Sequence, residues 1–212
     1  FDQLVAATVT QERLIALLGP GARQPFVGTF HVMGLQILAR FYGGEISVIT
    51  RGHQIELLQA LSGGAQRRAK ERAAAISKAR SMLLPPANDV LPIYEAYRAE
   101  LRAHNWFDFD DLIDEPLHLL RTNPAIHSAI VPYRRFLVDE YQDVSPSQYA
   151  LLRELMGGSA AVCAVGDADQ AIYGFRGADI SEFLDFRHDF PGTKAVTLTE
   201  SYRSTGKILN CA

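Results

Sequence analysis

The spacing of hydrophobic residues predicts a mixture of helices and short extended pieces at the start of the chain. Apolar residues at helical spacing indicate a helix over residues 3–18, which Gly19-Pro20-Gly21 ends. Residues 26–31 form an apolar run that predicts a short strand and turn, and residues 33–42 have the pattern of an apolar-faced helix. Residues 46–50 are expected to be briefly extended.

Helical periodicity dominates the next part of the chain, where no strand-like alternation occurs. The pattern predicts helices over residues 53–62, 65–83, 90–104 and 108–121. Pro85-Pro86 breaks the second of these helices from the third. We interpret this block as a helical subdomain inserted into an α/β frame.

The remainder of the chain alternates between short apolar runs and helical patterns. The apolar runs predict strands over residues 136–138, 160–165 and 195–198, the first two of them buried, and helices over 147–156 and 180–186 lie between them. The order strand, helix, strand, helix, strand is typical of a parallel sheet. The predicted fold class is therefore α/β, with a parallel sheet and an inserted all-helical subdomain.

Composition narrows the class of protein further. The 212 residues are 48% hydrophobic and 21% charged, which is enough apolar material for a substantial core. The net charge of −3 means that any contact with nucleic acid must come from a local basic patch. The two cysteines lack metal-ligand spacing, so we expect a reducing cytoplasm, and no apolar run is long enough to span a membrane. The first residues resemble neither a signal peptide nor an initiator methionine, so we expect a piece of a longer protein.

Two adjacent acids follow the predicted strand at residues 136–138. Ligands of open α/β sheets bind beyond the carboxyl ends of the strands, which is where Asp139 and Glu140 are expected. An Asp at a strand tip suits Mg²⁺, and the next carboxylate can orient or deprotonate an attacking water. The alternative is a strand that simply ends in solvated acids.

A glycine-rich stretch, residues 165–178, follows the next predicted strand. Gly166 permits a sharp turn, and Gln170 is placed to reach a terminal phosphate oxygen. Tyr173 and Phe175 offer stacking faces for unpaired bases, and Arg176 offers a fork that suits a phosphate. The alternative is a glycine-rich loop whose aromatic residues face the core.

Two further segments carry candidate chemistry. In residues 198–204, Arg203 is a candidate arginine finger and Tyr202 a candidate stacking partner for a purine, although a surface ion pair explains this short motif as well. The predicted helix over residues 65–83 carries a basic cluster that could follow a phosphate backbone or could be an ordinary solvated face. The members that we assign to DNA are Arg67, Arg68, Lys70 and Arg72.

These stretches together resemble the superfamily 1 helicases of the UvrD/Rep/PcrA kind. Residues 139–143, 165–178 and 198–204 look like motifs II, III and IV of that family, in the right order. Residues 28–31 are similar to motif Ib, and residues 107–112 match another recurrent segment of the family. The resemblance implies an incomplete RecA-like sheet of the P-loop NTPase class.

The resemblance also implies domains, ligands and residue roles. Residues 1–45 and 106–192 would be a partial motor domain 1A, residues 46–105 subdomain 1B, and residues 193–212 the start of motor domain 2A. ATP and Mg²⁺ would be bound, with Asp139 as the metal ligand, Glu140 as the catalytic base, and Gln170, Tyr202 and Arg203 on the nucleotide. Single-stranded DNA and its junctions with duplex would contact the basic helix and the following residues: Thr29, His31, Tyr173, Phe175 and Arg176.

The sequence contains no Gly-x-x-x-x-Gly-Lys-Thr phosphate loop, and motifs Ia, V and VI are missing too. We therefore expect a fragment of an ATP-dependent 3′–5′ DNA helicase whose 212 residues alone neither hydrolyse ATP appreciably nor unwind DNA. Two alternatives stay open: the helicase portion of a helicase–nuclease recombination subunit, and a non-hydrolysing DNA-binding scaffold derived from a helicase. A metabolic P-loop kinase would not explain residues 165–178.

Overall fold

The computed structural model describes residues 11–19, 25–123, 133–157, 160–171 and 186–209. Within these ranges the chain is a mixed α/β structure that is mostly helical and contains two small parallel sheets. Residues 11–18 are helical, which confirms the described part of the predicted N-terminal helix, and residues 3–10 lie outside the described ranges. None of the described helices is both long enough and apolar enough to cross a membrane.

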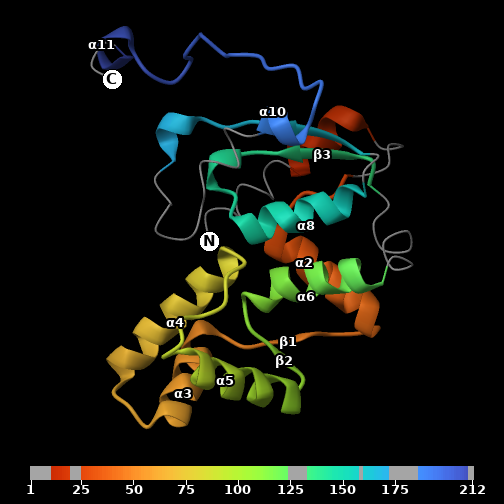
Figure 1. Ribbon diagram of the computed structural model, residues 1–212. Helices are drawn as coiled ribbons and strands as arrows, with labels where there is room; N and C mark the ends of the chain where they lie inside the picture. The colour runs from red at the N-terminus through yellow and green to blue at the C-terminus, as the bar shows by residue number, and fades with distance from the viewer. Residues whose placement is uncertain (1–10, 20–24, 124–132, 158–159, 172–185, 210–212) are drawn as a thin grey trace.

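Helix α2 spans Phe30–Tyr42 and begins earlier than the hydrophobic pattern predicts. Thr29 is its N-cap, and the Thr29 hydroxyl accepts a hydrogen bond from the backbone N–H of Val32 at 3.3 Å. The predicted strand over residues 26–31 is therefore wrong, because the threonine cap places Phe30 and His31 in the first helical turn. Helix α2 packs against α6, Asp111–Thr122, as Figure 1 shows.

The helical block forms a unit with a core of its own. It contains α3, Arg51–Ser62, α4, Gln66–Ser81, and α5, Leu91–Ala103, which lie close to the predicted helices. Strand β1, Ser47–Val48, enters the block and pairs in parallel with β2, Trp106–Phe107, where the block ends. The extended piece at 46–50 is thus confirmed, whereas β2 was not predicted.

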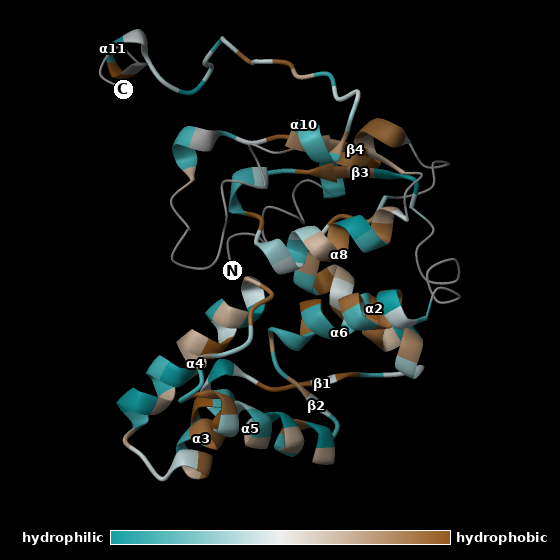
Figure 2. Ribbon diagram, viewed as in Figure 1, coloured by the Kyte–Doolittle hydropathy of each residue, from teal (hydrophilic) through white to brown (hydrophobic). Residues whose placement is uncertain are grey.

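The core of this block is separate from the core beneath the other sheet. Its buried apolar residues come from the three helices, with Ile49 just after β1 and Val90 just before α5, and include Leu58, Ala73, Ile76 and Tyr97. Figure 2 shows that α4 contains both hydrophilic and hydrophobic residues, and its buried residues include Ala69, Ala73 and Ile76. The pairing of β1 with β2 therefore brings the two ends of the helical block together.

The second sheet consists of β3, Arg135–Val138, and β4, Ala161–Ala164, which pair in parallel with Phe136 opposite Val162. Helix α8, Pro146–Met156, connects them and starts with a capping box between Ser145 and Gln148. These elements confirm the predicted strand–helix–strand order. The predicted burial of both strands is wrong, because in the part of the chain that the structure describes only alternate residues of each strand are half-buried, and Leu137 between them is 82% exposed.

The C-terminal part differs from the prediction. Residues 195–198 form no strand, because they pair with no other strand in the described ranges. Figure 1 shows this segment leaving the sheet and ending in α11, Gly206–Leu209. The predicted helix at 180–186 lies outside the described residues except for Phe186, the first residue of the short helix α10, Phe186–Asp189. Phe186 and Phe190 pack on the α8 side of the sheet.

Candidate functional site

The carboxyl ends of β3 and β4 meet at one edge of the sheet. Asp139 and Glu140 follow β3 directly, and Gly166 and Asp167 follow β4 after one residue. Two backbone hydrogen bonds of 2.9 Å tie the segments together, from Val165 N–H to the Val138 carbonyl and from Tyr141 N–H to the Val165 carbonyl. The predicted acids therefore lie beside the start of the predicted glycine-rich stretch.

Glu140 has an unusual backbone conformation. Its φ of 50° is in the left-handed region, which costs a non-glycine residue about 1 kcal/mol or more. The Asp139 carboxylate accepts the Glu140 N–H at 3.0 Å, and the Glu140 carbonyl accepts the Asp143 N–H at 2.9 Å. Because β3 ends at Val138, strand alternation does not hold the two acids on opposite faces of the sheet.

A buried glutamine joins the two segments of the site. Gln142 is 2% exposed, and its amide nitrogen donates to Glu140 Oε2 at 2.7 Å while its amide oxygen accepts from the Asp167 N–H at 3.1 Å. Asp167 in turn accepts a hydrogen bond from Gln170 Nε2 through Oδ2 at 2.7 Å. A chain of hydrogen bonds thus connects Glu140 with Gln170, both of which are exposed.

Glu140 and Gln170, at the two ends of these hydrogen bonds, were predicted as site residues, whereas Gln142 and Asp167 between them were not. Gln142 is buried beside Tyr141 in the turn after β3, and no local sequence pattern indicates its bond to Asp167, 25 positions away. Asp143, in the same turn, has one carboxylate oxygen, Oδ1, that is buried without a hydrogen-bond partner among the described residues. Burial and then the nearby charge of Glu140 raise the pKa of Asp143.

The surroundings of Asp139 fit a magnesium ion held together with a phosphate. Mg²⁺ is commonly bound by one or two carboxylates, several waters and substrate phosphates. Asp139 is exposed, and its Oδ2 forms no hydrogen bond within the described ranges. Among the described residues, no group of three or more His, Cys, Asp or Glu side chains could hold a metal ion with protein ligands alone. An exposed carboxylate such as that of Asp139 suits a magnesium ion that also binds waters and a phosphate.

The remaining candidates for nucleotide contact are not gathered at this edge. Tyr202 is 93% exposed, and its hydroxyl donates to Glu200 at 2.6 Å, which raises the pKa of Tyr202. Arg203 is exposed, and no hydrogen bond or ion pair within the described ranges connects it with Asp139, Glu140 or Gln170. The candidate DNA contacts Tyr173, Phe175 and Arg176 lie outside the described residues.

The predicted DNA residues at the start of α2 form an aromatic surface with a residue of another segment. His31 stacks on Phe109, with ring centroids 3.8 Å apart and an interplanar angle of 17°. Burial lowers the pKa of His31 to about 4, and the charge of Asp110 opposes this only in part. The imidazole is therefore neutral near pH 7. Phe109 is 59% exposed and was named in the sequence only as part of a recurrent segment.

The basic residues of α4 divide into two sets. Arg67, Arg68 and Lys70 are exposed and Arg72 is half-buried, with a solvated pair between Arg67 and Glu71 at 3.7 Å. Arg80 is buried instead, and it bonds Asp108, Asp111 and Asp114 around the start of α6. The outer set is free to meet a phosphate backbone, whereas Arg80 anchors α4 to α6.

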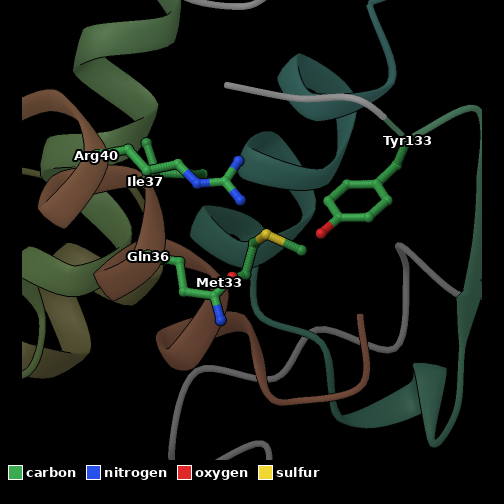
Figure 3. Close-up of a pocket in the computed structure, with 5 residues that line it drawn as sticks. All are labelled: Met33, Gln36, Ile37, Arg40 and Tyr133. Carbon is green, nitrogen blue, oxygen red and sulfur yellow. The ribbon is translucent and has the colours of Figure 1, made fainter. Parts of the chain in front are cut away.

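Two hollows on the surface contain none of the predicted site residues. A cavity of about 10 Å³, drawn in Figure 3, lies between Met33, Gln36, Ile37 and Arg40 of α2 and Tyr133, and has room for about one water. A larger open hollow of about 390 Å³ lies between the loop after α4 and helix α6. Neither hollow lies at the edge where β3 and β4 end.

Comparison with known proteins identifies the relatives of the chain. The family described as "UvrD/REP helicase N-terminal domain" matches residues 5–191. The chain is 37% identical to the ATP-dependent DNA helicase UvrD1 of Mycobacterium tuberculosis, over 98% of the chain and 31% of the relative. It is 35% identical to Rep of Escherichia coli and 31% identical to PcrA of Bacillus subtilis, again over 98% of the chain, and covers 34% and 31% of these two ATP-dependent DNA helicases. The chain spans about a third of the length of these relatives, and it belongs to the UvrD/REP helicase N-terminal domain family.

Proposed function

We propose that this chain is part of the motor of an ATP-dependent 3′–5′ DNA helicase, in which ATP hydrolysis drives movement along single-stranded DNA. The observation that carries the proposal is the hydrogen-bonded chain from Glu140 through Gln142 and Asp167 to Gln170. It joins a candidate base to a candidate phosphate sensor at the carboxyl edge of a parallel sheet, where ligands of α/β proteins bind. In this proposal the β3–β4 sheet belongs to a RecA-like motor domain 1A.

The nucleotide side would use few groups of this chain. Asp139 would hold Mg²⁺, which neutralises phosphate charge when it is bound. Glu140 would accept the proton of the attacking water, and Gln170 would donate its amide to the γ-phosphate. Tyr202 would stack on adenine and Arg203 would stabilise phosphate charge, both from the segment proposed to begin domain 2A. Because that segment leaves the sheet, closure of the two motor domains would complete the site (Figure 1).

The DNA side would begin at the aromatic surface of His31 and Phe109. A neutral imidazole stacked on an exposed phenyl ring offers an apolar face to a base and little charge to a phosphate. Thr29 already uses its hydroxyl to cap α2, so its main contribution would be to position His31. The phosphate contacts would come from Arg67, Arg68, Lys70 and Arg72 on subdomain 1B, which would meet the duplex at a junction.

The scaffold alternative explains the site less well than the motor does. A DNA-binding scaffold has no use for a strained glutamate that a buried amide holds next to a phosphate sensor. The helicase–nuclease alternative makes the same use of this region and differs only in a nuclease domain elsewhere in the parent protein. The 212 residues contain no phosphate loop. The phosphates of the nucleotide would therefore be fully bound only in a longer parent protein that supplies this loop.

The test is ATP hydrolysis and DNA unwinding by the parent protein that carries this chain and a phosphate loop. We expect turnover that single-stranded DNA stimulates, unwinding of duplexes with a 3′ tail, and loss of both on Glu140→Gln. Glu45→Gln is the matched control, because Glu45 is exposed in the segment between α2 and β1 and is not part of the turns that follow β3 and β4. The isolated 212 residues should show no turnover above background. Equal activity of the parent and its Glu140→Gln variant would overturn the proposal.

A further inference from the structure

We propose that Gln142 is a positioning residue that couples the two ends of the nucleotide site, so that Glu140 is correctly placed only when Gln170 is. This inference rests on the proposed function and deepens it. Gln142 does not touch the reacting atoms in this arrangement. It acts by holding the Glu140 carboxylate with one end of its amide and the Asp167 backbone with the other.

The orientation of the Gln142 amide follows from its two partners. The Glu140 carboxylate can only accept a hydrogen bond, and the Asp167 N–H can only donate one. The amide nitrogen must therefore face Glu140 and the amide oxygen must face Asp167, as the distances of 2.7 and 3.1 Å indicate. A flipped amide would lose both bonds in a place where the side chain is 2% exposed, and a buried group without partners is costly.

Asp167 connects the Gln142 amide to Gln170. Its carboxylate accepts the Asp169 N–H through Oδ1 at 3.0 Å and the Gln170 amide through Oδ2 at 2.7 Å. The same residue therefore fixes the turn that carries Gln170 and binds Gln142 through its backbone. When Gln170 exchanges Asp167 for a phosphate, the turn loses a bond next to the N–H that Gln142 holds. A movement of the Asp167 backbone would therefore displace the Gln142 amide and, with it, the Glu140 carboxylate that this amide binds.

The backbone of Glu140 makes this link more effective. Residues 139–143 are fixed by the hydrogen bonds of the turn, and Glu140 stays at positive φ. The freedom that is left is mainly in the Glu140 side chain, whose carboxylate is bound by Gln142. The direction in which the candidate base points is thus set by Gln142, two residues further along the chain.

The experiment compares Gln142→Met with Gln148→Met in the parent helicase. Methionine keeps the length of the side chain but removes the amide. Gln148 is the control, because its amide also bonds a backbone N–H, that of Ser145 at 3.1 Å, but takes no part in the chain to Gln170. We expect Gln142→Met to lower kcat for DNA-stimulated hydrolysis about 10- to 100-fold with little change in the KM for ATP, as misplaced catalytic groups do. Gln148→Met should lower stability and leave kcat unchanged.

A double-mutant cycle separates coupling from simple packing. If Gln142 acts through Asp167 and Gln170, Gln142→Met should cost much less kcat in a Gln170→Ala background than in the parent. Additive losses would overturn the coupling. Where Gln142→Met reduces the folded fraction, Gln142→Asn keeps an amide that is too short to bridge both partners, and it must show the same loss of kcat per folded molecule. Unchanged kcat in either folded variant also overturns the inference.

Failure of this inference can be told from failure of the proposed function. A parent protein that does not hydrolyse ATP, or whose Glu140→Gln variant stays active, contradicts both. A parent that needs Glu140 but tolerates Gln142→Met with full kcat contradicts only the role of Gln142.

Discussion

Arg80 donates from one guanidinium nitrogen, Nη1, to both carboxylate oxygens of Asp108, at 3.0 Å each, and both side chains are buried. The other nitrogens of Arg80 bond Asp111 and Asp114 at 2.6 Å. Burial alone would lower the pKa of Arg80, but the surrounding carboxylates outweigh it and raise that pKa. The guanidinium therefore stays charged and holds α4, in the helical block, against the start of α6.

Replacement of Arg80 should destabilise the chain strongly. Arg80→Leu leaves the buried carboxylates without their counter-charge, and loss of one partner of a buried ion pair costs about 3–5 kcal/mol. Arg67→Leu on the same helix removes a solvated charge and should change stability by less than about 0.5 kcal/mol. Urea unfolding of the 212-residue chain measures both. Equal stability of the two variants would contradict a structural role for the Arg80 cluster.

Gly34 should be intolerant of any side chain. A Cβ atom at this position would lie 1.7 Å from the backbone oxygen of Leu112, so α2 and α6 would have to separate. We expect Gly34→Ala to lower the free energy of unfolding by about 3 kcal/mol or more, the upper end of overpacking costs. Gly52→Ala is the control, because its Cβ meets nothing closer than 3.6 Å and alanine favours the helix by up to about 1 kcal/mol. Thermal melts of the two variants should therefore shift in opposite directions.

The stability of the chain should depend on His31 between pH 6.5 and about pH 4. In this window the unfolded chain binds a proton at His31 that the folded chain does not, because burial lowers the folded pKa from 6.5 to about 4. The contribution of His31 is thus present above the window and is lost as the pH falls through it, by at most about 3 kcal/mol. His31→Phe removes the titration and keeps an aromatic ring against Phe109.

The measurement is the difference in unfolding free energy between the unsubstituted 212-residue chain and its His31→Phe variant across this pH range. Burial raises the pKa of Asp108 to about 6, which acts with the opposite sign, because the folded state then binds the extra proton and loses stability as the pH rises. That effect is common to both proteins and cancels in the difference. If the two proteins lose stability in parallel below pH 6.5, His31 is not the group responsible.

Several features of this fold follow from local sequence signals. Strand β3, helix α8 and strand β4 are marked by an apolar run, by the cap at Ser145 and Gln148, and by a second apolar run. The two-residue strand β2 has no such signal, because its only definition is pairing with β1 far away in the sequence. The prediction of a strand at residues 26–31 was wrong, because the cap at Thr29 starts a helix and outweighs the strand propensity of the neighbouring residues.

Some residues of the candidate site can also be predicted from local sequence signals, whereas others depend on contacts between distant parts of the chain. Asp139, Glu140 and Gln170 can be named from residue types next to predicted strands. The importance of Gln142 depends on a hydrogen bond to a residue 25 positions away, which no local pattern contains. The stacking of His31 on Phe109, and the neutral state of that histidine, also depend on the packing of α2 near the start of α6.

Phe109→Ala should weaken the binding of single-stranded DNA. Stacking of a base on an aromatic side chain is worth about 1–3 kcal/mol, so affinity should fall by roughly 5- to 150-fold. Phe41→Ala is the control, since Phe41 is also an exposed phenylalanine but lies at the other end of α2 from His31. Fluorescence anisotropy of a labelled oligonucleotide at low salt measures both. Equal affinity of the two variants would exclude His31 and Phe109 as a base-stacking surface.

The basic face of α4 should determine how steeply DNA binding depends on salt. Each phosphate that a cation neutralises contributes about 0.7 to 0.9 to the magnitude of the slope of log affinity against log salt, so replacing four cations with glutamine should lower that magnitude by up to about 3.6. The four replaced residues are Arg67, Arg68, Lys70 and Arg72. The control variant removes the same charge from exposed cations elsewhere: Arg102, Arg134, Arg187 and Lys194. Binding of a tailed duplex by the 212-residue chain is measured for both variants over a salt series. The control is needed because a change in net charge alone would lower the slope equally in both variants. A lower slope only in the α4 variant would locate the phosphate contacts on this helix, and equal slopes would show that the basic face is merely solvated.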